Sequence, residues 1–151
     1  ATVIAGFLFA SLICSDSRAG LSSGQTAYVP IYSHVYVGER GHSFNLAVTL
    51  TIRNTDLRDQ ITIVSVDYHD SNGKLVKSHL EKPLLLDPLA STDFFVRESD
   101  ASGGMAPSFI VRWKSEKAVN EPIIEGVMIG ARSGQGISFV TRAKVIKDRT
   151  E

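Results

Sequence analysis

The stretch from His42 to Asp70 constrains the fold more than any other part of this 151-residue chain. Its first half carries apolar side chains at every second position: Leu46, Val48, Leu50 and Ile52. A period of two places these side chains on one face of an extended strand and the mainly polar residues between them on the other. A polar break at 54–60 separates this run from a second β-branched run, Ile61–Tyr68. Two long strands joined by a short polar loop predict the centre of an antiparallel sheet.

The second run changes its inward parity midway. Ile61 and Ile63 share one parity, whereas Val64, Val66 and Tyr68 share the other. A β-bulge inserts one residue and resets which side chains face inward. We therefore expect a bulge or a sharp twist near Ile63–Ser65.

The rest of the chain predicts about eight strands separated by short turns. Thr26–Val37 is expected to form the first strand, which should lie at a sheet edge or bend at Pro30 because proline cannot donate to the ladder. Trp113 is expected at the centre of the core. This spacing favours an all-β, immunoglobulin-like antiparallel β-sandwich, with a small closed β-barrel as the alternative.

The composition argues against two classes of partner. Sixteen basic and sixteen acidic residues balance to a net charge of zero and are scattered along the chain. Nucleic-acid binding through phosphates normally leaves a basic excess or stripe, so we expect no nucleic-acid partner. The same scatter offers no polybasic segment for an anionic membrane surface.

The first 19 residues differ from the remainder. Residues 1–13 are apolar throughout, and Ser17-Arg18-Ala19 is a small-x-small pattern. Residues 1–19 are therefore expected to be a secretory signal peptide or a membrane anchor, and Cys14 is a candidate for lipid attachment. Membrane association is expected only through this leader. The predicted division continues with a flexible junction at 20–25, the β-sandwich domain at 26–146 and a polar tail at 147–151.

Two loops carry oxygen ligands that suit a hard cation. Glu98 and Asp100 lie beside hydroxyls and paired glycines, and Asn120 and Glu121 lie in a later loop expected to reach the same end of the sandwich. Calcium prefers such ligands, so the four residues are weak candidates for a metal site. The structural alternative is that Asp100 caps a tight turn through local hydrogen bonds.

The first strand also carries a group of aromatic and imidazole side chains: Tyr28, Tyr32, His34 and Tyr36. Tyrosines on an edge strand provide contact area at low entropic cost, so these four are the candidate protein contacts. Ser33 and His34 alternate in a strand and are expected to face opposite sides, which excludes a nucleophile–base pair. Asp67 and His69 share a strand face but supply only two of the ligands that a zinc site needs.

Several motifs spread over the chain resemble an uncharacterised family of exported bacterial proteins that is classed only as a domain of unknown function. The likeness runs from about Gln25 to Ile146, and the segments that carry it are Tyr28–His34, Ser65–Tyr68, Pro88–Thr92, Glu98–Gly104, Asn120–Glu125 and Ser133–Phe139. The resemblance implies a single exported β domain, in the periplasm or on the outer face of the cell envelope. It implies no activity, cofactor or catalytic residue.

The sequence thus leads to three functional hypotheses. The first is a non-enzymatic exported module for protein–protein interaction or assembly, with a protein partner or a second copy of itself. The second is a calcium- or small-ligand-binding domain that uses the 98–104 and 120–125 loops. The third is a small hydrolase with two carboxylates drawn from Asp67, Glu98 and Asp100. No catalytic motif is present in the sequence, and no cofactor is expected.

Overall fold

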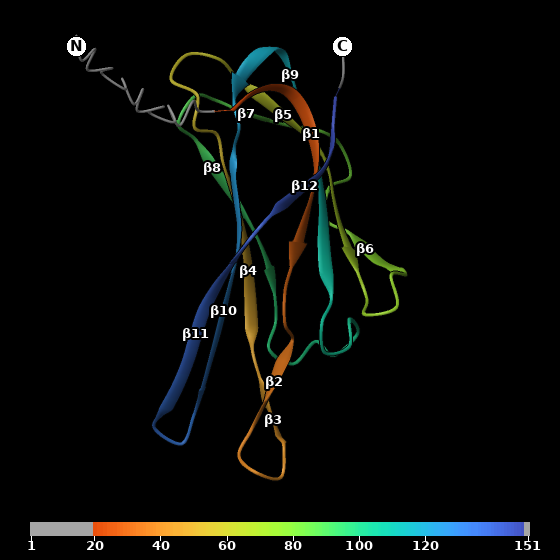
Figure 1. The fold of residues 1–151 in the computed structure, drawn as a ribbon, viewed down its shortest axis with the longest axis vertical. Helices are drawn as coiled ribbons and strands as arrows, with labels where there is room; N and C mark the ends of the chain where they lie inside the picture. The colour runs from red at the N-terminus through yellow and green to blue at the C-terminus, as the bar shows by residue number, and fades with distance from the viewer. Residues whose placement is uncertain (1–19, 150–151) are drawn as a thin grey trace, which may run out of the picture.

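The computed structural model describes residues 20–149 and contains a larger and a smaller antiparallel β-sheet (Figure 1). The larger sheet has the order β12-β1-β9-β5-β6, and β7 pairs with the other part of β5. Its strands are β1 (Leu21–Pro30), β5 (Ile61–His69), β6 (Leu75–Ser78), β7 (Leu84–Leu86), β9 (Ser108–Asn120) and β12 (Lys144–Asp148). We call this the six-stranded sheet.

The smaller sheet has the order β11-β10-β4-β8, and β2 pairs with β3 in a separate two-stranded ribbon. Its strands are β4 (Ala47–Arg53), β8 (Ser91–Val96), β10 (Ile123–Arg132) and β11 (Gln135–Arg142); the ribbon is β2 (His34–Val37) and β3 (His42–Asn45). The sheets remain separate, so the prediction of an all-β antiparallel sandwich is confirmed and the closed-barrel alternative is wrong.

The core forms from alternate side chains of both sheets. The predicted inward set of β4 is buried, and Phe109 and Val111 of β9 are buried opposite it together with Trp113, which was expected in the core. Trp113 also brings a polar atom, its Nε1, into this core. This atom has no hydrogen-bond partner among residues 20–149. Period-two alternation therefore determines which face of each long strand is buried.

The predicted bulge in β5 is present. The pairing of β5 with β9 shifts register between Ile63 and Ser65. Ile61 and Ile63 are buried before the shift, and Val66 and Tyr68 are buried after it. Val64 lies at the shift itself and is 37% exposed, so its predicted inward orientation is wrong. The extra residue thus lets both halves of the strand face the same core.

The start of the domain differs from the sequence prediction. Leu21–Gln25 is not a flexible junction but the first half of β1, paired with both β9 and β12. The predicted strand over Thr26–Val37 ends at Pro30 and resumes only at His34, as the missing N–H of proline requires. β1 lies between β12 and β9, so it is not an edge strand.

The end of the chain also differs. β11 ends at Arg142, and the chain crosses at Ala143 to the other sheet, where it continues as β12. Lys147 and Asp148, expected in a polar tail, pair with Thr26 and Gln25. Because expected strands are divided in this way, residues 20–149 form twelve strands rather than the predicted eight or so.

The predicted leader at 1–19 lies outside the described residues. Between residues 20 and 149, no helix is long and apolar enough to cross a membrane.

Two glycines of β10 face the core and let other segments approach closely. A Cβ added at Gly126 would lie 2.9 Å from Cγ2 of Ile31, and one added at Gly130 would lie 2.6 Å from both the Asn45 carbonyl oxygen and Cε1 of Phe44. Any larger residue would therefore push β10 away from β3 and from the end of β1. Close packing of this kind tolerates little extra volume.

Replacement of Gly130 tests this close approach. We expect Gly130→Ala to lower the free energy of unfolding by about 1–3 kcal/mol, the usual cost of overpacking. The exposed Gly136→Ala on β11 is the matched control, since its Cβ would meet only the Gly130 carbonyl oxygen at 3.8 Å. Urea denaturation followed by circular dichroism measures both, and equal stability of the two variants would contradict the prediction.

Candidate functional site

The two loops predicted to share a metal site lie at opposite ends of the sandwich. The 98–104 loop precedes β9, and Asn120 ends the same thirteen-residue strand. Glu98 and Asp100 are therefore separated from Asn120 and Glu121 by the whole length of β9. Within residues 20–149, no group of three or more histidine, cysteine, aspartate or glutamate side chains is arranged to hold a metal ion. The two-loop site is wrong.

Each of the predicted acidic ligands has a local structural partner instead. The Asp100 carboxylate accepts hydrogen bonds from the backbone N–H and the hydroxyl of Ser102, at 2.9 and 2.5 Å, which agrees with the turn-capping alternative. These bonds lower the pKa of Asp100 below its ordinary value. Glu121 accepts a 2.7 Å hydrogen bond from Nε2 of Gln25. Glu98 lies beside Ser43 and Arg132 in a shallow depression at the far end of the smaller sheet.

The four candidate protein contacts do not form one surface. Tyr28 points outward from β1, whereas Tyr32 lies in the break after Pro30 and packs edge-on against Phe139, with ring centroids 5.7 Å apart. His34 and Tyr36 pack against each other on the β2–β3 ribbon, with ring centroids 5.3 Å apart. The interruption at Pro30 therefore divides the predicted patch into three places.

Ser33 and His34 lie closer than the alternation predicted. Ser33 precedes β2 and is not in a strand, so its Oγ lies 3.2 Å from Nδ1 of His34. The Ser33 hydroxyl donates to the Gly104 carbonyl oxygen. Its proton is thus directed away from the imidazole, which is the wrong arrangement for a nucleophile activated by a base.

Asp67 and His69 do not approach a metal-binding arrangement. The Asp67 carboxylate forms an ion pair with Arg112 at 2.8 Å and accepts a hydrogen bond from Ser78 at 2.7 Å. Nδ1 of His69 lies 3.3 Å from the Asp67 carbonyl oxygen. Asp67 therefore stabilises the pairing of β5 with β6 and β9.

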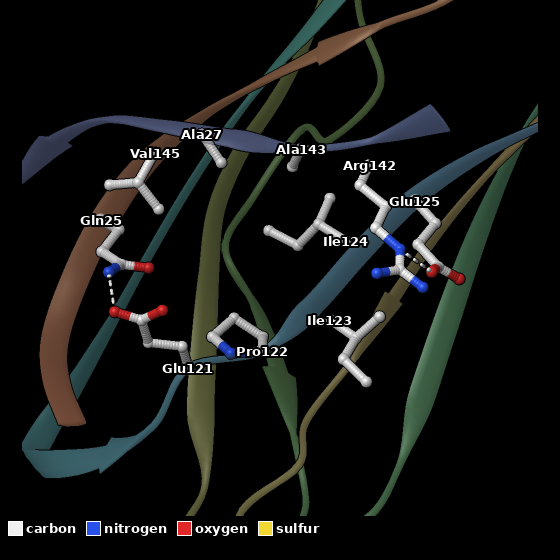
Figure 2. Close-up of a pocket in the computed structure, with 10 residues that line it drawn as sticks. All are labelled: Gln25, Ala27, Glu121, Pro122, Ile123, Ile124, Glu125, Arg142, Ala143 and Val145. Atoms are coloured by element: carbon white, nitrogen blue, oxygen red, sulfur yellow. Dashed lines mark hydrogen bonds and ion pairs between the residues drawn. The ribbon is translucent and has the colours of Figure 1, made fainter. Parts of the chain in front are cut away.

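A pocket of about 300 Å³ opens at the seam where the chain crosses between the sheets (Figure 2). Ala27 and Val145 line it from the six-stranded sheet, and Ile124 from the smaller sheet, with Ala143 at the crossing between them. The floor is apolar because Ala27 and Ile124 are core residues. Its volume is at the lower end of the range for small-molecule sites.

Polar groups stand on two sides of this pocket. Gln25 and Glu121 are hydrogen-bonded on one side, and Glu125 and Arg142 form an ion pair of 3.6 Å on the other (Figure 2). Proline and isoleucine of the Pro122–Ile123 segment lie between the two pairs. Residues 121–125 therefore line a pocket with residues of β1, β11 and β12, and not with the 98–104 loop.

An aromatic cluster at the other end of the sandwich holds two buried polar atoms. His79 packs against Phe94 and Phe109, with ring centroids 5.8 and 5.4 Å apart, and Tyr68 lies 6.4 Å from His79. The Tyr68 hydroxyl and Nε2 of His79 have no hydrogen-bond partner among residues 20–149. A Cβ at Gly103 would lie 2.2 Å from the Tyr68 hydroxyl, so the glycine-rich loop closes over this cluster.

Burial shifts the protonation of both groups. Desolvation raises the pKa of Tyr68 to about 12, and the nearby Asp100 carboxylate adds to this effect. Desolvation also lowers the pKa of His79, an effect that Lys77 strengthens and that Asp100 and Asp67 oppose. Both side chains are thus held neutral near pH 7.

The outer face of the smaller sheet carries apolar side chains from all four of its strands. One cross-strand row runs Phe95, Thr49, Val127 and Val140, in successive registered pairs from β8 to β11. Ile129 and Ala47 form the adjacent row. Phe95, Ile129 and Val140 are 57%, 55% and 53% exposed. We call Phe95, Thr49, Val127, Val140, Ile129 and Ala47 the apolar face.

Sequence reasoning did not find this face because its members come from four strands that are distant in the chain. Val127 and Ile129 alternate with the buried Met128, so the β10 run contained apolar residues on both faces. A strand with apolar side chains on both faces was the one signal available before the pairing was known.

The fold and these surfaces define an antiparallel β-sandwich with a pocket at the sheet seam and an exposed apolar sheet face. The chain belongs to the family described as "Protein of unknown function (DUF3124)", whose profile matches residues 24–146. A crystal structure of Thermotoga maritima 1070 is similar with a TM-score of 0.45 and 13% identity, over 80% of this chain and 92% of that one. No curated protein matches the chain.

The aromatic cluster predicts an acid-sensitive contribution to stability. The folded pKa of His79 lies below its ordinary value of 6.5, so the unfolded chain binds more protons at this residue as the pH falls through 6.5. The contribution is present above that pH and is lost progressively below it. We expect His79→Phe to remove this part of the pH dependence, measured as urea midpoints between pH 5 and pH 8. The exposed His42→Phe is the control, and an unchanged pH dependence in His79→Phe would refute the assignment.

Proposed function

We propose that this protein is a non-enzymatic, exported interaction module that associates with a second copy of itself through the apolar face. The apolar face is the single observation that supports this function. Contiguous exposed apolar surface on a stable domain is typical of protein-interaction sites. Export is proposed from the apolar residues 1–13 and the small-x-small pattern at Ser17-Arg18-Ala19, with the periplasm or the outer face of the envelope as the location.

The order of residues across the sheet favours a second copy as the occupant. A two-fold axis parallel to the strands, between β4 and β10, would place each β8 over β11 of the partner. Phe95 would then meet Val140 of the second copy, and Thr49 would meet Val127. Apolar and β-branched side chains would thus face each other along the whole row.

The neighbouring row supports the same arrangement through charge. It runs Asp93, Thr51, Glu125 and Arg142 from β8 to β11, in successive registered pairs. The same two-fold axis would place the acidic Asp93 over the basic Arg142 of the second copy, twice in each dimer. Like charges would not be opposed at either edge, which is the complementarity expected of a self-associating face.

A single charge on the apolar face tests the proposal. We expect Phe95→Lys to convert the dimer to a monomer in sedimentation velocity while leaving the circular dichroism spectrum unchanged, because Phe95 is exposed. Leu85→Lys on β7 is the matched control, since Leu85 is also 57% exposed but belongs to the six-stranded sheet. A wild-type protein that remains monomeric at high micromolar concentration would refute self-association.

Charge exchange tests the choice of partner. We expect Asp93→Arg to weaken the dimer and the combined Asp93→Arg and Arg142→Asp exchange to restore it, because the two positions face each other across the axis. Single exposed pairs contribute about 0.2–1 kcal/mol each, so the two symmetric pairs should change the dissociation constant by about 2- to 30-fold. Failure of the double exchange to recover the dimer would exclude this two-fold arrangement.

The seam pocket supports a second candidate function, the binding of a small organic ligand. Its apolar floor and flanking polar pairs match the usual construction of small-molecule sites. The ligand would be mainly apolar, with polar groups at both ends to meet Glu121 and Arg142. The calcium form of this hypothesis receives no support from the described residues, because the two predicted loops do not meet.

The neutral probe N-phenyl-1-naphthylamine tests this second candidate. We expect its fluorescence to rise on binding to the wild-type protein and the rise to be lost in Ala143→Phe, whose ring would fill the pocket. Ala131→Phe is the control, since Ala131 is exposed at the far end of β10. Equal probe binding by the two variants would show that the pocket is not the site.

A further inference from the structure

The outer face of the six-stranded sheet carries a groove between β12 and β9. Two adjoining hollows of about 670 and 610 Å³ make up this groove, and both are lined by Gly24 or its neighbour Ser23 and by Lys114 and Arg149. Arg112 and Lys147 line the larger hollow as well. We call Arg112, Lys114, Lys147 and Arg149, with the hollows between them, the basic groove.

Strand register brings these cations together from distant parts of the sequence. Lys147 and Arg112 both pair with Thr26, from opposite sides of β1. Lys114 pairs with Gly24, and the Arg149 N–H donates to the Gly24 carbonyl oxygen at 2.9 Å. Because Gly24 has no side chain, the Arg149 side chain can lie over this part of β1, with its Cδ 3.4 Å from where a Cβ of Gly24 would be. The scatter of charge along the sequence therefore becomes a local basic excess on one face.

Most of these cations have no acidic partner. Arg112 pairs with Asp67, but Lys114, Lys147 and Arg149 form no ion pair with any of residues 20–149. Two acidic residues also line the groove, Asp148, which accepts a hydrogen bond from Ser22 at 3.2 Å, and Glu116. With Arg112 paired to Asp67, three cations against these two acids leave an excess of one positive charge in a chain whose total is zero.

We infer that the basic groove binds a linear acidic polysaccharide. Cations on both rims suit the carboxylate or sulfate groups along such a chain. The hydroxyls of Ser23, Thr26 and Thr62 suit hydrogen bonding to sugar hydroxyls, and the apolar side chains of Val64 and Ile146 provide surfaces for ring faces. The groove thus offers each kind of contact that a charged sugar chain requires.

The shape and composition of the groove favour this ligand over two others. Two hollows that adjoin at Lys114 and Arg149 suit a single extended chain, whereas an anionic membrane is a broad surface that protruding basic side chains meet best. Single-stranded nucleic acid binds on rows of stacking aromatic side chains, and none of the residues lining the two hollows except the buried Trp113 is aromatic. The groove lies on the opposite side of the sandwich from the apolar face, so this activity is separate from the proposed self-association.

Fluorescence anisotropy with a labelled heparin oligosaccharide, a chain of sulfated sugars, tests the inference. We expect binding at low salt that weakens as the salt concentration rises, and no binding of neutral dextran. The triple variant Lys114→Ala, Lys147→Ala and Arg149→Ala should bind about tenfold more weakly, from three lost contacts of ordinary exposed-pair strength. The matched control, Arg40→Ala, Lys74→Ala and Arg132→Ala, removes the same charge outside the groove and should bind as the wild type does.

Several outcomes would overturn the inference. Equal binding by the two triple variants would show that net charge, rather than the groove, attracts the oligosaccharide. Absence of binding at low salt would exclude the site altogether. Tighter binding to anionic phospholipid vesicles or to poly-dT than to the oligosaccharide, lost in the groove variant alone, would assign the groove to a membrane or to nucleic acid instead. If the groove variant sediments as the wild type does, its loss of oligosaccharide binding is independent of self-association.

Discussion

The close approach of β10 to the segments beneath it is the packing constraint on which the sandwich depends. Gly126 and Gly130 leave room for Ile31 and Phe44, so the chain can turn out of β1 and enter the β2–β3 ribbon directly under the smaller sheet. The inward side chains of β4 and β9 then fill the space between the sheets at the density of a protein interior. The close approach at Gly126 and Gly130 and the large inward side chains of β4 and β9 together fill the space between the sheets.

The same arrangement gives the two outer faces different chemistry. The smaller sheet presents apolar side chains from all four strands, whereas the six-stranded sheet presents cations on β9 and β12. Each face collects residues from strands that are far apart in the chain and adjacent only through pairing. Because the proposed contacts lie on opposite faces, self-association would leave both basic grooves of a dimer open to solvent.

Local patterns predicted the parts of the fold that depend on local chemistry. The alternation of Leu46–Ile52, the parity change near Ile63 and the break at Pro30 each reflect the geometry of one strand, and all three are present. The sites were harder to predict because they depend on pairing. The 98–104 and 120–125 loops were expected to meet in one metal site, but β9 holds them at opposite ends of the sandwich. Nothing in the sequence indicated that Gly24, Lys114 and Arg149 lie close together, because only strand pairing makes them neighbours. A strand pair with a long sequence separation leaves no periodic signal in either partner.

The crossing at Ala143 has a mechanical consequence for the pocket beside it. β11 belongs to one sheet and β12 to the other, so at this crossing one residue, Ala143, links the two layers. The pocket walls are divided between the same two layers, as Figure 2 shows for Ala27 and Ile124. A molecule held there would act as a wedge against sliding of one layer over the other. A ligand in this small pocket would therefore make the whole sandwich more resistant to sliding of its two sheets.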